Sequence, residues 1–303
     1  MIPQKFVKYT IKEFRKDFAT DDICLDYLFK QFYGHLNDFD KYYKIKGRKE
    51  YVHSVTGEHI SPTANSIFHK SSTPLTTWFE VIYKFCNSRN GVSAMEIMRD
   101  FGMTYKCAWR VANQVRSLFG SSKTDKLAGI VEADETYIGG KEGNKKLSKR
   151  QKGTQGRSSK TKTPVIGVVK RTDEDSKSEI RAKVVTDTTR STIMPFVKAN
   201  VKINSSLMTD EYQSYNGAYS AGYDHQRVIH SSSQYVFGNV YTNTMEGFWS
   251  LLKCGITGTY RMVSPKYLQM YVNEFMYRYN HDHSKSHLFE TVLCNLVRND
   301  LVV

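Results

Sequence analysis

The chain has 303 residues, of which 40% are hydrophobic and 13% aromatic, so it can bury a sizeable core and is not disordered. Its 44 Lys and Arg against 30 Asp and Glu give a formal charge of +14, which favours a polyanionic partner such as nucleic acid over a merely basic soluble protein. Five cysteines without C-x-x-C spacing, a charged N-terminus and the lack of a long apolar run argue against a disulfide framework, a signal peptide and a membrane span.

Residues 1–90 form a first region of aromatic and mixed character. Apolar residues recur at helical spacing over 17–34, where Asp21 or Asp22 can cap a helix, and a second helix is predicted over 73–86. Between these helices the chain is first charged and aromatic and then rich in turn residues.

Residues 91–120 are predicted to form two helices joined at Gly102, the second of them capped by Thr104. Apolar residues of the second helix fall on one face, and basic residues lie elsewhere: Ala108, Val111 and Val115 against Lys106, Arg110 and Arg116. A helix-turn-helix of this kind could place its second helix in a major groove, with DNA contacts from Thr104, Lys106 and Arg110. An ordinary pair of antiparallel helices fits the pattern equally well.

From residue 128 onward, strands and helices alternate. The predicted order is three strands, a helix, two further strands and two helices, at 129–140, 163–171, 178–186, 188–201, 205–212, 225–230, 243–253 and 265–280. This order is typical of a mixed α/β domain.

A basic loop follows the first of these strands. Residues 141–162 contain nine Lys or Arg and one acid, interspersed with Gly and Ser. We expect the loop to track phosphates beside the site that the strand carries, although most charge runs are only solvated. The candidate DNA contacts are Lys141, Lys145, Lys146, Lys149, Arg150 and Lys152.

Two aspartates are placed by strands. Asp134 lies in the middle of an apolar strand, where a carboxylate is costly unless it is hydrogen-bonded or binds a metal. Strand alternation places Glu132 and Thr136 on the same face as Asp134 and Glu135 on the other. Asp210 closes a later strand, a position at which α/β sheets commonly present ligand-binding groups.

A glutamate is placed by a helix. Glu246 shares one edge of the helix over 243–253 with Ser250 and Lys253, beside an apolar stripe that contains Trp249. Carboxylates without Cys or His nearby suit Mg²⁺ or Mn²⁺, and three can hold two ions about 3.5–4 Å apart for phosphodiester chemistry. Acidic residues are common, so spacing alone does not single out this trio.

Long motifs add a family resemblance. VEADETYIGGK, TDEYQSYN and the segment from His230 to His281 closely resemble the ISXO-like insertion-sequence transposases of bacteria, which are relatives of the eukaryotic Merlin transposons. CLDYLFKQFYG, ISPTANSIFHKSSTPLTTWF and SAMEIMRDFGMTYKCAWRVANQVR resemble the N-terminal region of that family, so the resemblance spans nearly the whole chain.

The resemblance implies a ribonuclease-H-like catalytic domain over 128–285, followed by a tail over 286–303. Its Asp-Asp-Glu triad falls on Asp134, Asp210 and Glu246, with two Mg²⁺ or Mn²⁺ ions as cofactors. The basic residue seven positions after the glutamate falls on Lys253, which is implied to contact DNA near the cleaved phosphate.

One departure concerns a four-cysteine zinc ribbon that the family carries before ISPTA. His53 and Thr56 stand where the second cysteine pair belongs, and the first pair is absent as well. We therefore expect no structural zinc. The ribbon is then either shortened, held by the packing of Tyr42, Tyr43 and Tyr51, or poorly ordered.

The resulting expectation is a transposase that cuts and joins double-stranded DNA at element ends and at a target, acting as a homo-oligomer without a membrane. It would work in the cytoplasm at the nucleoid of a bacterium, or in a nucleus. The alternatives are a DNA-binding protein that has lost catalysis, and a related nuclease that acts on RNA or on DNA junctions.

Overall fold

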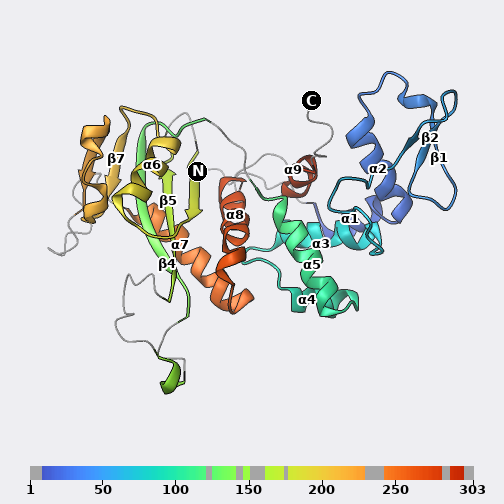
Figure 1. Ribbon diagram of the computed structural model, residues 1–303. Helices are drawn as coiled ribbons and strands as arrows, with labels where there is room; N and C mark the ends of the chain where they lie inside the picture. Colours follow the sequence, from blue (N-terminus) through green and yellow to red (C-terminus); the bar gives the residue numbers. More distant parts are fainter. Residues whose placement is uncertain are drawn as a thin grey trace. The chain divides into compact units, whose positions relative to one another are not determined.

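The computed structural model describes residues 9–120, 125–140, 146–150, 161–173, 177–228, 242–281 and 287–296 (Figure 1). The chain divides into two compact units, which we call unit 1 and unit 2. Unit 1 combines Met1–Phe119 with His283–Val303, and unit 2 is Gly120–Asp282. Unit 1 thus contains the predicted region 1–90, all but the last residue of the predicted region 91–120, and the predicted tail 286–303. In the described part of the chain, no helix has the length and apolar character that a membrane span needs.

Unit 1 is mainly helical, as predicted. Its helices are α1 (Ile11–Asp17), α2 (Asp21–Tyr33), α3 (Leu75–Asn87), α4 (Ala94–Phe101), α5 (Tyr105–Ser117) and α9 (Leu288–Cys294). The predicted cap of α2 is wrong, because Thr20 is the N-cap and its side chain accepts a hydrogen bond from the Ile23 amide. Asp21 instead accepts hydrogen bonds from the amide and the hydroxyl of Thr76, at 2.9 and 2.8 Å, and thereby joins α2 to the start of α3.

The segment at the position of the family's zinc ribbon forms a small antiparallel sheet. Its strands are β1 (Tyr42–Lys44), β2 (Tyr51–His53) and β3 (His59–Ile60), in that order. Tyr51 stacks on Phe29 of α2 with ring centroids 3.8 Å apart, and Tyr42 packs edge-on against His53 at 4.8 Å. Tyr43, which one of the three alternatives for this segment included in the packing, is 58% exposed.

The two positions where the family has a cysteine pair form a hydrogen-bonded turn. The buried His53 ring accepts hydrogen bonds at Nδ1 from the amides of Val55 and Thr56, at 3.3 and 3.0 Å. The Thr56 hydroxyl lies 3.0 Å from the same nitrogen. The turn therefore has polar contacts of its own, which supplement the aromatic packing of the sheet.

The predicted helix pair is present in unit 1. α4 ends at Gly102, whose φ of 61° is left-handed, and α5 begins after Thr104, whose side chain accepts from the Cys107 amide. The apolar face of α5 is buried as expected, and Arg116, which was predicted to lie away from that face, is buried as well. Arg116 is 2% exposed because its guanidinium donates to the Val92 carbonyl at 2.9 Å and lies over the Phe85 ring.

Unit 2 is built on a five-stranded mixed sheet. Its strands are β4 (Ile130–Ile138), β5 (Thr163–Lys170), β6 (Glu179–Val184), β7 (Ser206–Thr209) and β8 (Asp224–Arg227), in the spatial order β6-β5-β4-β7-β8. β5 is antiparallel to both of its neighbours, whereas β7 runs parallel to β4 and to β8. The predicted order of strands and helices in this part of the chain is confirmed.

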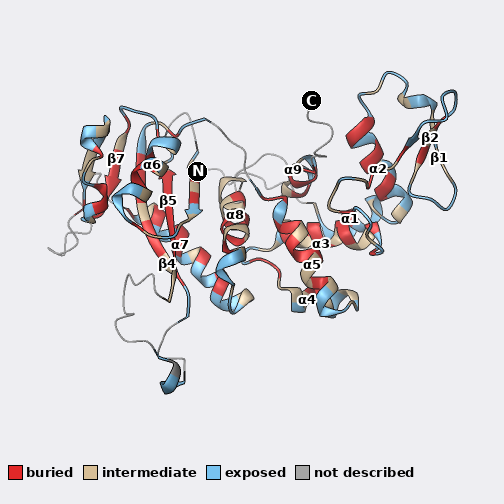
Figure 2. Cartoon of the chain, viewed as in Figure 1, coloured by how far each residue is buried: buried red, intermediate tan, exposed pale blue. Residues whose placement is uncertain are grey.

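Helices cover both faces of this sheet. α6 (Arg190–Asn200) packs on one face, and α7 (Asn243–Gly255) and α8 (Pro265–His281) pack on the other, each over an apolar core (Figures 1 and 2). On β4, Val131 and Ala133 enter the core under α6, whereas Ile138 enters the core under α7 and α8. Since side chains alternate along a strand, Glu132 and Asp134 belong to the face that α7 covers.

Candidate functional site

Two of the predicted site residues lie on neighbouring parallel strands. The register of β4 and β7 pairs Ile130 with Ser206 and Glu132 with Met208, so Asp134 is level with Asp210, the residue that follows β7. Asp210 is buried, and one of its carboxylate oxygens accepts the Tyr212 amide at 3.0 Å. The parallel pairing therefore brings two carboxylates from distant parts of the sequence to the same level of the sheet.

A third carboxylate joins them. Asp134, Glu135 and Asp210 each offer an oxygen within 4.8 Å of the others, the one group of acidic, His or Cys side chains in the described residues that is close enough to share a metal. Glu135 was not among the predicted site residues. Alternation places it on the opposite face of the strand from Asp134, and its carboxylate accepts the Tyr215 hydroxyl at 3.2 Å. The ladder between β4 and β7 ends before these residues, so side chains of opposite faces can approach each other there.

Glu246 and Lys253 meet Asp134 at a cavity. The cavity measures about 570 Å³, and its walls come from β4 and from one edge of α7. Glu246, Ser250 and Lys253, which the sequence analysis placed on one helix edge, all line it together with Asp134. Glu246 is exposed, and one of its oxygens accepts the Thr242 hydroxyl at 3.3 Å. A ligand that entered from solvent would meet Glu246 and Lys253 on its way to Asp134.

Negative charge is concentrated at this site. The pKa of Asp134 is raised to about 7, chiefly by burial and also by the nearby charges of Asp210 and Glu246, while hydrogen bonds from the Glu135 amide and from Trp249 oppose the shift. Carboxylates held this close repel each other unless a proton or a cation lies between them. The site therefore has the electrostatic character of a cation site.

Trp249 contacts the centre of the site. Trp249 was predicted to be a core residue and is 3% exposed, but its indole Nε1 also donates to Asp134 at 3.1 Å. Gly167 on β5 is directly opposite Asp134 in the ladder. A Cβ atom on Gly167 would lie 2.9 Å from the Trp249 ring and 2.3 Å from Met245, so the indole lies where any other residue would place its side chain.

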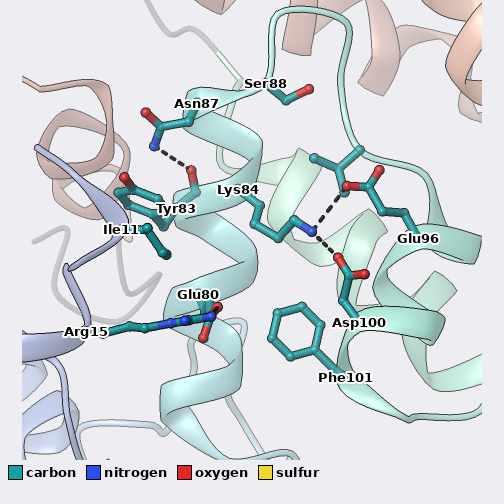
Figure 3. A pocket seen from close by; sticks show the side chains of 11 residues that line it. Ile11, Arg15, Glu80, Tyr83, Lys84, Asn87, Ser88, Glu96, Asp100 and Phe101 are labelled. Carbon is teal, nitrogen blue, oxygen red and sulfur yellow. Dashed lines mark hydrogen bonds and ion pairs between the residues drawn. The ribbon is translucent and has the colours of Figure 1, made fainter. Parts of the chain in front are cut away.

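A second cavity, of about 570 Å³, lies in unit 1 and includes none of the predicted site residues (Figure 3). Figure 3 shows the Lys84 ammonium group between the carboxylates of Glu96 and Asp100, and both ion pairs join α3 to α4. Arg15 of α1 pairs with Glu80 of α3 at 2.6 Å. The charged groups of this cavity serve to hold helices together.

Comparison with known proteins identifies the family. The ISXO2-like transposase domain matches residues 126–280, which are just over half of the chain and include the whole sheet of unit 2. The chain belongs to the ISXO2-like transposase family. The match confirms the resemblance seen in the sequence motifs.

Two similar proteins come from mobile elements or are named for them. A protein of Halobacterium salinarum, named as an uncharacterized protein in transposable element ISH50, is 26% identical over 221 residues, 70% of this chain and 72% of that protein. An uncharacterized transposase-like protein of Haemophilus influenzae is 25% identical over 126 residues, 42% of this chain and 99% of that protein. Both relatives are thus named for a transposable element or for a transposase, in agreement with the family match.

The residues predicted to contact DNA in this transposase are only partly visible. Lys146 and Arg150 flank a short helix after β4 and are exposed, whereas Lys141, Lys145, Lys152 and the side chain of Lys149 lie outside the described residues.

On the helix pair, Thr104 and Lys106 are exposed. Arg110 is half-buried, donates to Ser71 at 3.3 Å and lies over the Trp78 ring. Arg110 thus already has contacts within unit 1, and Lys106 is the basic side chain of this helix that solvent reaches most freely.

Proposed function

We propose that this transposase-family chain is a metal-dependent enzyme that cuts and joins DNA strands at the ends of an insertion sequence, with Asp134, Asp210 and Glu246 as its triad. The observation that carries the proposal is the position of Asp134. Its carboxylate belongs to the cluster with Asp210 and lines the cavity with Glu246 and Lys253. Residues from one strand, the end of a second strand and a helix thereby meet at one point.

The proposed fold of unit 2 is ribonuclease-H-like. Three features support it: the first strand is central, the second strand is antiparallel to it, and the two later strands follow in parallel on the other side. Helices on both faces of the sheet are a further feature. In this arrangement the acids stand at the middle of the first strand and at the end of the fourth.

The donor set fits a hard divalent cation. All the candidate ligands are carboxylates, which Mg²⁺ and Mn²⁺ prefer, and the raised pKa of Asp134 indicates negative charge that a cation would neutralise. Asp134, Asp210 and Glu246 would hold two ions, with Glu135 close by. When bound, the ions would neutralise charge at the reacting phosphate and lower the pKa of the attacking water or hydroxyl group.

The protein's own groups would position the reactants. Trp249 orients the Asp134 carboxylate through its indole N–H, and Lys253 faces the same cavity as a counter-charge for a DNA phosphate. In the first step water attacks the phosphorus at the element end, and the bond to the 3′ oxygen breaks, which leaves a 3′ hydroxyl. In the second step the oxygen of this hydroxyl attacks a phosphorus of the target in line, so that a new phosphodiester joins the element to the target and the bond from that phosphorus to the target's own 3′ oxygen breaks, which leaves a 3′ hydroxyl on the target.

The proposed partner is double-stranded DNA, both element ends and target. The exposed Lys146 and Arg150 beyond β4 and the helix pair of unit 1 are the proposed contact surfaces. Joining two element ends in one reaction requires at least a dimer, so we propose that the active species is a homo-oligomer.

The test uses a DNA duplex with an element end, taken from the inverted repeats that flank the gene. With Mg²⁺ or Mn²⁺ the protein should nick this duplex, and with Ca²⁺ it should bind with little cleavage. Asp134→Asn should abolish nicking while leaving binding intact, and so should Asp210→Asn and Glu246→Gln. Glu211→Gln, which changes the exposed acid next to Asp210, is the matched control and should nick like the wild type.

Two results would contradict the proposal. Normal nicking by the Asp134→Asn variant would remove that residue from the active site. Specific binding of the duplex by the wild-type protein, with no cleavage under any divalent metal, would favour the alternative of a DNA-binding protein that has lost catalysis.

A further inference from the structure

Glu132 is a fully buried carboxylate two residues before Asp134 on the same face of β4, and its exposed fraction is 0%. Its Oε1 accepts the Thr244 hydroxyl at 2.8 Å and the Arg171 guanidinium at 2.6 Å, and its Oε2 accepts the Met245 amide at 2.9 Å. Thr244 and Met245 are in the first turn of α7, directly before Glu246. Glu132 therefore links the strand of one triad residue to the helix turn of another.

These contacts suit a structural anchor rather than a metal ligand. Both oxygens of Glu132 already accept hydrogen bonds, and Arg171 balances the charge that burial would otherwise disfavour. The first amides of a helix have no partners within the helix, and a negative charge beside them is favourable. Glu132 thus supplies the acceptor that the start of α7 needs, although it comes from a strand that is 112 residues earlier than Thr244.

A second contact joins the same two elements further along. Trp249 of α7 donates to Asp134. The helix therefore contacts β4 at two points, through Met245 on Glu132 and through Trp249 on Asp134. Four residues of helix rise about 6 Å, and two residues of strand advance about 6.8 Å. The two spacings match, so α7 runs alongside β4 at this point. One contact would let the helix turn or slide, whereas two set its register.

We propose that Glu132 is a positioning residue for the metal site: it fixes the start of α7 on β4 so that Glu246 faces Asp134. This inference rests on the proposed function, since it assumes that Glu246 and Asp134 hold metal together. Outer partners of this kind typically change metal affinity by about 10–100-fold when they are removed. We therefore expect the Glu132→Gln variant to bind Mn²⁺ about 10–100-fold more weakly than the wild type.

The experiment measures Mn²⁺ binding to the full chain without DNA, by electron paramagnetic resonance of free Mn²⁺, next to unfolding curves in chelator. The matched control is Glu274→Gln. Glu274 is also 0% exposed and lies in unit 2. It accepts the Tyr260 hydroxyl and pairs with Arg278, and both of these residues come after α7 in the sequence. It should lose a comparable amount of stability and keep Mn²⁺ affinity within about twofold, since neither Tyr260 nor Arg278 lines the cavity at Asp134.

A milder variant covers the case in which Glu132→Gln fails to fold. Thr244→Val keeps the Glu132–Arg171 ion pair and removes one hydrogen bond of the anchor. A bond of this strength corresponds to a decrease of about 2–10-fold in Mn²⁺ affinity. Because Thr244 is half-buried, the valine variant should still fold, and its Mn²⁺ affinity can then be measured.

The outcomes separate the two proposals. If Asp134→Asn abolishes Mn²⁺ binding while Glu132→Gln and Thr244→Val bind like the wild type, the positioning role is overturned and the metal site stands. If Glu132→Gln and Glu274→Gln weaken binding equally, the effect is a general loss of stability, which also overturns the role. If Asp134→Asn binds Mn²⁺ as well as the wild type, the proposed function itself fails.

Discussion

Gly167 offers the sharpest test of how closely α7 lies against the sheet. An alanine at this position adds a Cβ that would lie 2.3 Å from the Met245 methyl and 2.9 Å from the Trp249 ring. The methionine methyl can swing away at little cost, but the indole is held by its core neighbours and by Asp134. The Trp249 indole must therefore shift, and its hydrogen bond to the Asp134 carboxylate must shift with it.

The expected magnitude follows from two opposing effects. Replacing a strand glycine by alanine reduces the freedom of the unfolded chain, which stabilises by about 0.4–1 kcal/mol, whereas overpacking a core costs about 1–3 kcal/mol. The cost outweighs the gain, so Gly167→Ala should lower the free energy of unfolding by about 0.5–2 kcal/mol. A displaced active-site group of this kind should also slow nicking by about 10–100-fold.

Urea unfolding and single-turnover nicking measure the two effects, and hydrogen exchange of peptides from β5 and α7 locates the change. Gly247→Ala is the matched control on the same helix, because a Cβ there meets nothing within 4 Å. It should stabilise the protein by up to about 1 kcal/mol through helix propensity. If Gly167→Ala is as stable as the wild type and nicks at the same rate, the close packing of Trp249 over Asp134 does not matter for either property.

Three further predictions concern the rest of the chain. The purified protein should contain no stoichiometric zinc, because the family's cysteine positions are filled otherwise; elemental analysis that finds about one zinc per chain, as a closed structural site needs, would contradict this. Alanine at four basic positions of the loop, Lys145, Lys146, Lys149 and Arg150, should weaken binding to DNA of any sequence and flatten the slope of log affinity against log salt by about two to four. An unchanged slope would show that the loop touches no phosphate. Hydrogen bonds from Thr189 and Thr192 lower the pKa of Asp187, so this carboxylate stabilises the start of α6 above the ordinary aspartate pKa, and the stabilisation is lost as the pH falls below it. Asp187→Asn should therefore lower the melting temperature at pH 7 but not at the acid limit, and an equal loss at both would refute the charge effect.

Much of the fold of unit 2 was predictable because its elements have clear periodicities. Strand alternation around Asp134 and the helical spacing of Glu246 and Lys253 are local properties, and the structure shows both. Asp210 was placed by the rule that sheets present ligand groups where strands end, and it does follow the last residue of β7.

The parts that sequence analysis missed depend on contacts between distant residues. Glu135 approaches Asp210 because the ladder of β4 and β7 stops before them, which no local pattern reveals. The helical spacing of Arg116 does not reveal its burial, which a carbonyl and an aromatic ring from outside its helix allow. Glu132 lies on the predicted face of its strand, but the donors that make it an anchor come from a helix more than a hundred residues later.

The packing of α9 has a consequence for the order in which the protein is made. Phe289 of α9 is 1% exposed and lies within 5.4 Å of Phe14 and 6.0 Å of Tyr83, between ring centroids, in the core of unit 1. A ribosome delivers α9 only after all of unit 2 has emerged, so unit 1 completes its core last although its first helices are made first. A gene copy interrupted by a stop codon or frameshift within unit 2 therefore loses part of the core of unit 1 as well. Truncated copies of such a gene would yield an unstable fragment instead of a separately folded unit 1.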